Sequence, residues 1–534
     1  MGQEVQVTTT AAQKPVLKQH EIWEEGHLAH PCAVVIFGAT GDLTQRKLLP
    51  TLAHLWHDHP LPHPFVIVGF ARRQMTLDQW REMALNSVNT YMEENDRMDA
   101  EAQQAFAQCL FYCQANFDDP AGYQKLAALL EELDKDHGTA GNRLFYMATP
   151  PELDTEVIRH LGASGLSRPV HGNDNGGNNN HDASWTRIII EKPFGHDLAS
   201  AQQLNRTLGR AFRENQIYRI DHYMGKETVQ NILAFRFSNR MFEPVWNLNY
   251  IDNVQILVAE SLGIGTRAEY YETSGAIRDM IQNHMMQVLS LTTMEPPDAF
   301  DAESIRDEKI KVLRAIPLFT PEEVKQCVVR GQYTAGVIDG QPVQGYKQEK
   351  GVAPNSTTET YVALKLYIEN WRWAGVPFYL RTGKHLPVRS TEVTIQFKRV
   401  PHLLYKPADT KGLKSNLIVI RIQPDEGIAI RFGAKIPGAE NHLATVKMDF
   451  NYSTAFGIES PDAYERLIAD AMEGDSTLFI RRDEIEASWR IVDSITSVWK
   501  TMPPDTVYPY PAGSWGPPEA ETLIQKDGRE WHNP

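Results

Sequence analysis

Side chains of five different kinds are crowded into the short segment 219–227. They are Arg219, Asp221, His222, Tyr223 and Lys226. A short apolar strand is expected before the segment and a helix after it. A cluster of this composition can bind an anion and transfer a proton, which are two tasks of an enzyme active site. A strand-to-helix turn stabilised by salt bridges would account for the same residues without any chemistry.

Lys226 stands at the start of the helix predicted over residues 226–236. An anion bound there would meet the ammonium group and the positive end of the helix dipole together. His222 and Tyr223 can add further hydrogen-bond donors. The segment therefore predicts a pocket for a substrate that carries a terminal phosphate or carboxylate.

His284 is a second candidate, on a helix predicted to begin near residue 273. The apolar stripe of this helix consists of Ile277, Ile281, Met285 and Val288. His284 lies on or beside that stripe, and such a histidine is most often a core residue with satisfied hydrogen bonds. Asp279 and Asn283 on the same helix, and Asp221 elsewhere, favour another interpretation. A histidine oriented by a carboxylate is suited to take a proton from a hydroxyl group.

A glycine-containing turn follows the first predicted strand, residues 33–37, and opens the first predicted helix. Its residues are Gly38, Ala39, Thr40, Gly41, Asp42 and Leu43. Glycines there allow backbone N–H groups to approach a pyrophosphate at the helix N-terminus, as in dinucleotide-binding folds. The usual third glycine is absent, so the prediction depends on the position of the turn directly after the first strand.

The end of the second predicted strand, residues 65–70, indicates which dinucleotide binds. An NAD enzyme usually has an acidic residue there, whereas this chain has Arg72 and Arg73, with Thr40 and Arg46 near the same end. Guanidinium groups suit a ribose 2′-phosphate, so the sequence predicts NADP rather than NAD. The alternative is that the two arginines only cover the surface of a helix.

Lys192 follows another predicted buried strand, residues 185–190, and precedes Pro193. Ligands of doubly wound sheets bind at this carboxyl edge of the strands. Pro193 restricts Lys192 to an extended conformation, and a cis peptide bond between them would direct the side chain into the cleft. Alternatively, Lys192 is an ordinary lysine at a strand end whose amine reaches solvent.

Two kinds of framework are predicted to position these residues. Before about residue 220, strands at 33–37, 65–70, 143–148 and 185–190 alternate with helices, which indicates an α/β domain with a doubly wound parallel sheet of the Rossmann type. Later alternating patterns at 253–260, 360–369, 392–398 and 417–423 predict a larger α+β domain with a mostly antiparallel sheet.

The predicted division of the chain has four parts. We expect a flexible tail over 1–30, an NADP-binding domain over 31–220 with a polar surface insertion at 171–181, a substrate and dimerisation domain over 221–515, and a C-terminal tail over 516–534. A chain of 534 residues is too long for one core. We see no internal repeat.

The composition excludes several classes of protein. Apolar residues make up 42% and charged residues 23%, as in soluble globular proteins, and the net charge of −15 argues against binding to nucleic acid or an anionic membrane. No apolar run approaches the roughly 20 residues that span a bilayer. The four cysteines have no metal-binding spacing, so we expect a reduced, cytoplasmic protein without a metal.

Five motifs, in order along about residues 33–515, resemble the glucose-6-phosphate dehydrogenase family. They are the glycine turn, Glu-Lys-Pro-Phe-Gly at 191–195, the segment 219–227, the helix at 278–284 and Leu-Arg-Thr-Gly-Lys at 380–384. The resemblance implies oxidation of β-D-glucose 6-phosphate at C1 to 6-phospho-D-glucono-1,5-lactone, with hydride transfer to NADP. This reaction is the first step of the oxidative pentose phosphate pathway. We expect a homodimer or a dimer of dimers.

The resemblance also implies roles for individual residues. His284 would be the general base, and Asp221 would orient it and stabilise its charged form. Lys192 would lie between cofactor and sugar. The residues implied to bind the phosphate are His222, Tyr223 and Lys226, and those implied to contact the rest of the sugar are Glu260, Asp279, Lys384, Arg389 and Gln423. Tyr146 would join the glycine turn and Arg72 at the cofactor.

Two other interpretations and one departure from the family remain. Oxidoreductases of the glucose–fructose oxidoreductase kind also have a Glu-Lys-Pro strand end with a sheet domain behind it, but are usually shorter and need no phosphate cluster. A catalytically inactive NADP sensor is a different class.

Some animal family members bind a second, structural NADP through basic residues after the equivalent of Arg381. Residues 389–394 lack most of that basic set, so we expect no structural NADP.

Overall fold

The computed structural model describes residues 5–7, 30–58, 64–170, 184–338, 340–405, 413–438, 441–457 and 462–534. The predicted insertion at 171–181 lies outside the described residues. So does the predicted N-terminal tail, except for His30 and the strand β1 (Val5–Val7), which pairs in parallel with the edge of the larger sheet.

The first domain is built on a six-stranded sheet in the order β4-β3-β2-β5-β6-β7, with every neighbouring pair parallel. Its strands are β2 (Cys32–Phe37), β3 (Phe65–Ala71), β4 (Leu110–Gln114), β5 (Arg143–Met147), β6 (Thr186–Ile190) and β7 (Ile217–Arg219). The strand order reverses between β2 and β5, where dinucleotide-binding folds place their ligand. The predicted Rossmann-type sheet is confirmed, although β4 had not been predicted.

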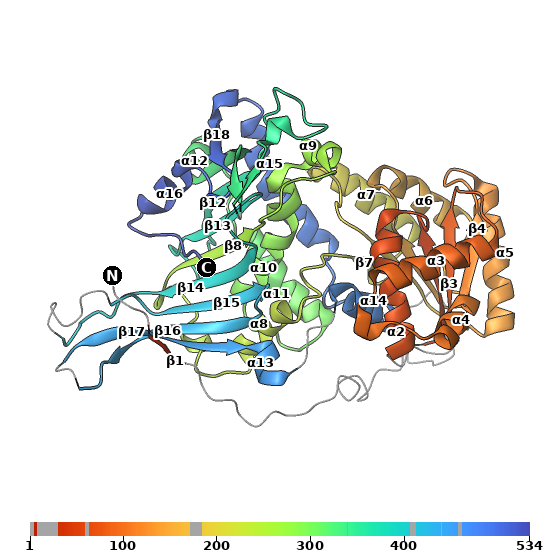
Figure 1. The fold of residues 1–534 in the computed structure, drawn as a ribbon, viewed down its shortest axis with the longest axis horizontal. Helices are drawn as coiled ribbons and strands as arrows, with labels where there is room; N and C mark the ends of the chain where they lie inside the picture. Colours follow the sequence, from red (N-terminus) through yellow and green to blue (C-terminus); the bar gives the residue numbers. More distant parts are fainter. Residues whose placement is uncertain are drawn as a thin grey trace.

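Helices cover this sheet on both faces (Figure 1). They are α2 (Leu49–Asp58), α3 (Leu77–Tyr91), α4 (Ala100–Gln108), α5 (Pro120–His137), α6 (Pro151–Ala163) and α7 (Leu198–Ala211). All residues of β2 and β3 are buried. A strand covered on both faces needs apolar residues at every position, which explains why these strands appear in the sequence as unbroken apolar runs.

The second domain contains a ten-stranded sheet in the order β1-β17-β16-β15-β14-β8-β13-β12-β9-β18. Its remaining strands are β8 (Ile251–Ala259), β9 (Val328–Thr334), β12 (Tyr361–Leu366), β13 (Phe378–Gly383), β14 (Ser390–Phe397), β15 (Leu417–Gln423), β16 (Gly427–Lys435), β17 (Leu443–Asn451) and β18 (Val507–Pro511). The pairs β1–β17, β8–β13 and β9–β18 are parallel and the others antiparallel, so the mostly antiparallel sheet is confirmed.

Helices α8 (Glu227–Phe237), α10 (Met286–Thr293) and α11 (Ala302–Arg314) lie on one face of this sheet (Figure 1). On β15, Ile418, Ile420 and Ile422 point into the core beneath these helices. Leu417 and Val419 alternate with them and form a separate apolar cluster with Ala429 on the opposite face. The two-residue period of a strand thus assigns one face of the sheet to the helices.

Late helices connect the two domains. Helix α15 (Arg482–Trp499) packs on the end of the first domain, where the indole Nε1 of Trp489 donates to the carbonyl of Phe194 at 2.9 Å. Near α14 (Ala463–Glu473), Arg187 of β6 donates to the carbonyl of Ala471 at 2.9 Å. The first domain therefore depends for part of its covering on chain that follows β17 and precedes β18, the last strand of the second sheet.

The segment 516–534, predicted as a tail, is packed instead. It contains α16 (Pro518–Gln525), and Trp531 is 8% exposed with its Nε1 donating to the carbonyl of Ala520. The guanidinium of Arg381 lies 4.9 Å from the ring centre of Trp515 and 4.5 Å from that of Trp531. The few buried apolar residues of this polar, proline-rich segment form no periodic pattern, which is why the sequence suggested a tail. None of the helices in the described part of the chain is long and apolar enough to cross a bilayer.

Candidate active site

The carboxylate of Asp221 contacts Nδ1 of His284, and each side chain is 1% exposed. Asp221 comes two residues after β7, and its Oδ1 also accepts the backbone N–H of Tyr223 at 3.0 Å. The two residues lie 63 positions apart. Asp221 follows the last strand of the parallel sheet and so belongs with the first domain, just past the predicted boundary at residue 220, whereas His284 belongs to the second. The structure therefore brings together the predicted base and its predicted orienting carboxylate.

His284 lies on an unusual helix. Helix α9 (Ala268–Ala276) is interrupted at Gly275, which has φ 61° and ψ 176°. The chain then starts a new helix whose first part, Ile277–Met285, is π-helical and continues as α10. The sequence had predicted one helix from about residue 273, and its apolar stripe did not reveal the break or the wider turns. Short π-helical segments are frequent at functional sites.

Lys192, at the carboxyl end of β6, reaches the Asp221–His284 pair from the first domain. Its Nζ lies 2.8 Å from Nε2 of His284 and 3.3 Å from Oδ1 of Asp279. The peptide bond between Lys192 and Pro193 is cis. Asp279 is also approached by the hydroxyl of Tyr270 at 3.4 Å, a residue for which the sequence gave no signal.

Lys384 and Glu260 lie on the other side of Asp279. The Lys384 ammonium is 2.5 Å from Oε2 of Glu260 and 3.9 Å from Oδ2 of Asp279. This arrangement follows from the parallel pairing of β8 with β13, which sets Ala259 opposite Gly383. Glu260 and Lys384 are the next residues on their chains, so both leave the sheet at the same edge.

The residues predicted to bind phosphate form a second group, two of whose rings pack against the His284 ring. The Tyr223 ring stacks on the His284 ring with 4.3 Å between centres, and the His222 ring centre is 4.6 Å from that of His284. Lys226 precedes α8 as its N-cap, as predicted, and its Nζ lies 2.7 Å from Oε1 of Gln423. A bound anion there would meet Lys226, the start of α8 and an amide.

Two further polar contacts place Gln423 in this group, and an electrostatic effect places Arg389 near it. The Gln423 amide nitrogen lies 3.5 Å from the Tyr223 hydroxyl and 3.0 Å from Oγ1 of Thr391, which the sequence had not singled out. Arg389 is exposed, and its charge is among the causes that lower the pKa of Lys226, after burial. All the residues predicted to contact the substrate therefore surround His284 or Lys226.

The charges fix the protonation of the pair. Burial would raise the pKa of Asp221, but the charge of His284 and its hydrogen bond lower this pKa to about 2. Burial lowers the pKa of His284 below the ordinary value of 6.5, with Asp221 opposing and Lys192 adding to the effect. An ionised Asp221 only accepts and an ammonium only donates, so the hydrogen of neutral His284 is on Nδ1 and Nε2 is the basic atom.

The glycine turn lies at the reversal point of the parallel sheet. Gly38 has φ 85°, and a Cβ added to it would lie 2.4 Å from the carbonyl oxygen of Ala148, so only glycine fits. Arg72 follows β3 and is exposed, while the Nε of Arg46 pairs with Asp42 at 2.7 Å. A turn with two glycines, followed by a helix and with arginines nearby, fits a phosphorylated dinucleotide.

Tyr146 has a different environment from that of the other predicted cofactor residues. It is 1% exposed on β5, and its hydroxyl donates to Oε1 of Glu191 at 2.6 Å. Glu191 directly precedes Lys192, so Tyr146 supports the strand end that carries this lysine. Its contact with the cofactor stays a prediction.

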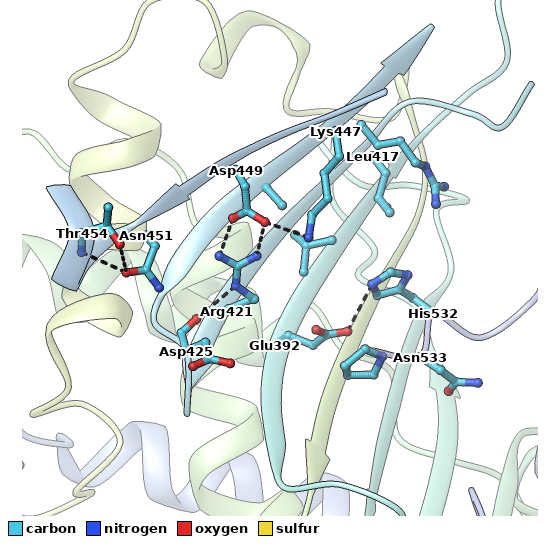
Figure 2. A pocket seen from close by; sticks show the side chains of 14 residues that line it. Glu392, Leu417, Arg421, Asp425, Lys447, Asp449, Asn451, Thr454, His532 and Asn533 are labelled. Atoms are coloured by element: carbon cyan, nitrogen blue, oxygen red, sulfur yellow. Dashed lines mark hydrogen bonds and ion pairs between the residues drawn. The ribbon is translucent and has the colours of Figure 1, made fainter. Parts of the chain in front are cut away.

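A cavity of about 650 Å³ lies elsewhere, on the face of the larger sheet that carries Leu417 and Val419 (Figure 2). Arg421 and Lys447 line it, and both pair with Asp449. The C-terminal residues, including His532, lie along it. The predicted absence of a structural NADP rests on residues 389–394, whereas the basic residues of this cavity lie further along the chain. That absence stays a prediction.

Comparison with known proteins identifies the family. The family model for the glucose-6-phosphate dehydrogenase NAD binding domain matches residues 35–231, and that for the glucose-6-phosphate dehydrogenase C-terminal domain matches residues 233–532. This chain belongs to the glucose-6-phosphate dehydrogenase family. The resemblance found in the five sequence motifs is thereby confirmed.

Individual members of the glucose-6-phosphate dehydrogenase family are similar over nearly their whole length. The glucose-6-phosphate 1-dehydrogenase of Chlamydia pneumoniae is 47% identical, covering 94% of this chain and 96% of that protein. That of Bacillus subtilis is 44% identical, covering 94% and 98%. A solved glucose-6-phosphate dehydrogenase in complex with its substrate glucose-6-phosphate has a TM-score of 0.83 at 34% identity, covering 95% of this chain and all of that one. A Mycobacterium avium glucose-6-phosphate 1-dehydrogenase has a TM-score of 0.79 at 35% identity, covering 95% and 99%.

Replacement of Lys192 by methionine should shift the pH dependence of this glucose-6-phosphate dehydrogenase family member. Its kcat/KM should fall as the pH drops through the pKa of His284, which lies below 6.5. Because the charge of Lys192 lowers that pKa, Lys192→Met should move the acid limb to higher pH, in addition to lowering the rate. Rate profiles between about pH 5 and 9 measure the shift. Lys311→Met, on the exposed side of α11, is the control, and an unmoved limb in Lys192→Met would contradict the proposed contact.

Replacement of Lys226 by alanine tests the phosphate pocket. Lys226→Ala should raise the KM for the phosphorylated sugar by about tenfold or more while changing kcat less, because it removes a binding charge and leaves the base in place. The KM for the dinucleotide should stay constant. An unchanged sugar KM would place the phosphate site elsewhere.

Proposed function

We propose that this chain is a glucose-6-phosphate 1-dehydrogenase that uses NADP and carries out the first step of the oxidative pentose phosphate pathway. The observation that carries the proposal is a cluster of contacts in which the buried Asp221–His284 pair lies between Lys192 and the group around Lys226. The full-length similarity to proteins named glucose-6-phosphate 1-dehydrogenase supports the same activity.

His284 is the general base in this mechanism. Its Nε2 takes the proton of the C1 hydroxyl group of β-D-glucose 6-phosphate, and the hydrogen on C1 leaves as hydride, so that C1 becomes the carbonyl carbon of 6-phospho-D-glucono-1,5-lactone. NADP bound at the glycine turn supplies the acceptor for that hydride. The ionised Asp221 then stabilises the imidazolium, since Nδ1–H already donates to it.

The charged residues beside His284 position the sugar. Lys192 and Lys384 bracket Asp279, and Glu260 pairs with Lys384, which gives donors and acceptors that sugar hydroxyl groups can bridge. Each of these ions is neutralised by a neighbour, so a neutral sugar ring can enter without leaving a buried charge uncompensated.

The phosphate group selects the substrate. Lys226 provides charge at the start of α8, and Arg389 adds a second cation from the larger sheet domain. Burial, with the charges of His284 and Lys192, holds the pKa of His222 well below 6.5, so His222 acts as a neutral donor. Enzymes of the glucose–fructose oxidoreductase kind need no such group.

Assembly and location belong to the same proposal. Three large apolar side chains are exposed on and just after β17, the strand next to the edge strand β1: Met448 (46%), Phe450 (37%) and Phe456 (43%). Large apolar side chains in this position suit a contact with a second copy of the chain. We therefore expect a homodimer or dimer of dimers, active in the cytoplasm.

The central test follows the absorbance of reduced nicotinamide with glucose 6-phosphate or free glucose. Rapid turnover is expected with the phosphorylated sugar and NADP, and comparable turnover of free glucose would favour the glucose–fructose oxidoreductase kind. His284→Asn should lower kcat by about 10²–10⁴ while sugar binding is retained, because only the positioned base is removed. Near-normal turnover of that variant would falsify the role of His284.

Arg72→Glu tests the choice of dinucleotide. The carboxylate would repel a ribose 2′-phosphate and accept from a 2′-hydroxyl, so kcat/KM should fall far more for NADP than for NAD. Initial rates with each dinucleotide measure the ratio. Arg168→Glu, the same change at an exposed arginine that follows α6, away from the end of β3, is the control. Equal losses with NADP and NAD in Arg72→Glu would exclude this residue as the selector.

A further inference from the structure

The helix that carries Asp279 and His284 is capped by a residue from a distant part of the chain. The backbone N–H of Ala276 donates to the carbonyl of Glu359 at 2.9 Å, and that of Ile277 donates to Oε1 of the Glu359 side chain at 3.1 Å. The first N–H groups of a helix have no partner within the helix. One residue of the second domain therefore satisfies the start of this helix with both its carbonyl and its carboxylate.

The surroundings are shaped for this contact. Glu359 is 6% exposed, and burial raises the pKa of its carboxyl group, with the N–H of Ile277 opposing. A Cβ added at Gly275 would lie 2.3 Å from Oε1 of Glu359. The break in the helix at Gly275 thus supplies both the turn and the space that the carboxylate needs.

The next residue, Thr360, holds Lys384. The backbone N–H of Lys384 donates to the carbonyl of Thr360 at 2.9 Å, beyond the end of the β12–β13 ladder. The buried Tyr510 hydroxyl donates to the carbonyl of Lys384 at 2.7 Å and lies 3.0 Å from Oγ1 of Thr360. Adjacent residues therefore fix the start of the helix with Asp279 and the backbone of the lysine that faces it.

We infer that Glu359 is a positioning residue for the reaction: it sets the place of Asp279 and His284 relative to Lys384. Asp279 lies in the first turn of the helix, so a shift at Ile277 changes the position of its carboxylate relative to Lys192 and Lys384. Glu359 makes no contact with substrate in this role, and the inference rests on the proposed dehydrogenase activity. Misplacement of reacting groups by about 1 Å can cost about 100-fold in rate.

Three substitutions of Glu359 separate its contributions. Glu359→Gln keeps an oxygen acceptor of the same reach, so kcat and the sugar KM should stay within about threefold of the wild type. Glu359→Ala removes the acceptor and should lower kcat/KM for glucose 6-phosphate by about 10- to 100-fold, through both kcat and KM. Glu359→Asp keeps the charge with a shorter reach and should lie between the two. The NADP Kd, measured by fluorescence, should be unchanged in all three.

Asp301→Ala is the matched control, because the Asp301 side chain caps α11 by accepting from Glu303 and Ser304, both at 3.0 Å, away from the site. It should lower Tm without changing kcat or KM. Wild-type kinetics in Glu359→Ala despite a lower Tm would overturn the inference, leaving only a structural cap. If Glu359→Ala does not fold, the comparison of Glu359→Asp with Glu359→Gln decides. Equal kcat and KM in these two variants would overturn the inference. Failure of the wild type to oxidise glucose 6-phosphate would instead refute the proposed function.

Discussion

The contact between the Asp221 carboxylate and the His284 imidazole sets the conditions for the rest of the structure. Both groups are buried, and an ionised carboxylate without a partner in such a place costs several kcal/mol. Asp221 therefore depends on His284, and the neutral His284 depends on Asp221 for the tautomer that leaves Nε2 basic. Because the two residues come from different domains, each domain presents a group that is satisfied only when the other is in place.

The remaining charges of the site follow the same pattern of mutual compensation. Lys192 comes from the parallel sheet, whereas Asp279 and Lys384 come from the helix and the sheet of the second domain. Lys192 contacts both the Asp279 carboxylate and the His284 imidazole, so one ammonium group links the two proposed roles of the site, proton transfer and sugar binding. Its position therefore depends on the strand end at residue 192 and on the helix near residue 279.

Much of this arrangement was accessible from the sequence because it is local. Strands β2, β3, β5, β6 and β15 match predicted apolar runs, and Lys226 stands at the start of its helix as predicted. The pairing of Asp221 with His284 was expected, since both were candidates of complementary chemistry. The family resemblance supplied Glu260 and Lys384, which have no local pattern of their own.

The parts that escaped prediction depend on contacts between distant segments. The break at Gly275 is favoured by Glu359, which is 82 residues further along from the N–H it accepts, and nothing near Gly275 reveals this. The packed C-terminal segment is held by Trp531 and by its neighbour across the fold, Arg381, so its own composition was misleading. Parallel pairing of β8 with β13 likewise arises only from the tertiary fold.

The contact of Lys226 with Gln423 joins residues that are 197 positions apart. A nascent chain that has released residues 1–226 from the ribosome therefore still lacks the amide that contacts Lys226. A chain that ends before β15 lacks Gln423 altogether. Translation consequently completes the group around Lys226 only late, after most of the polypeptide has been made.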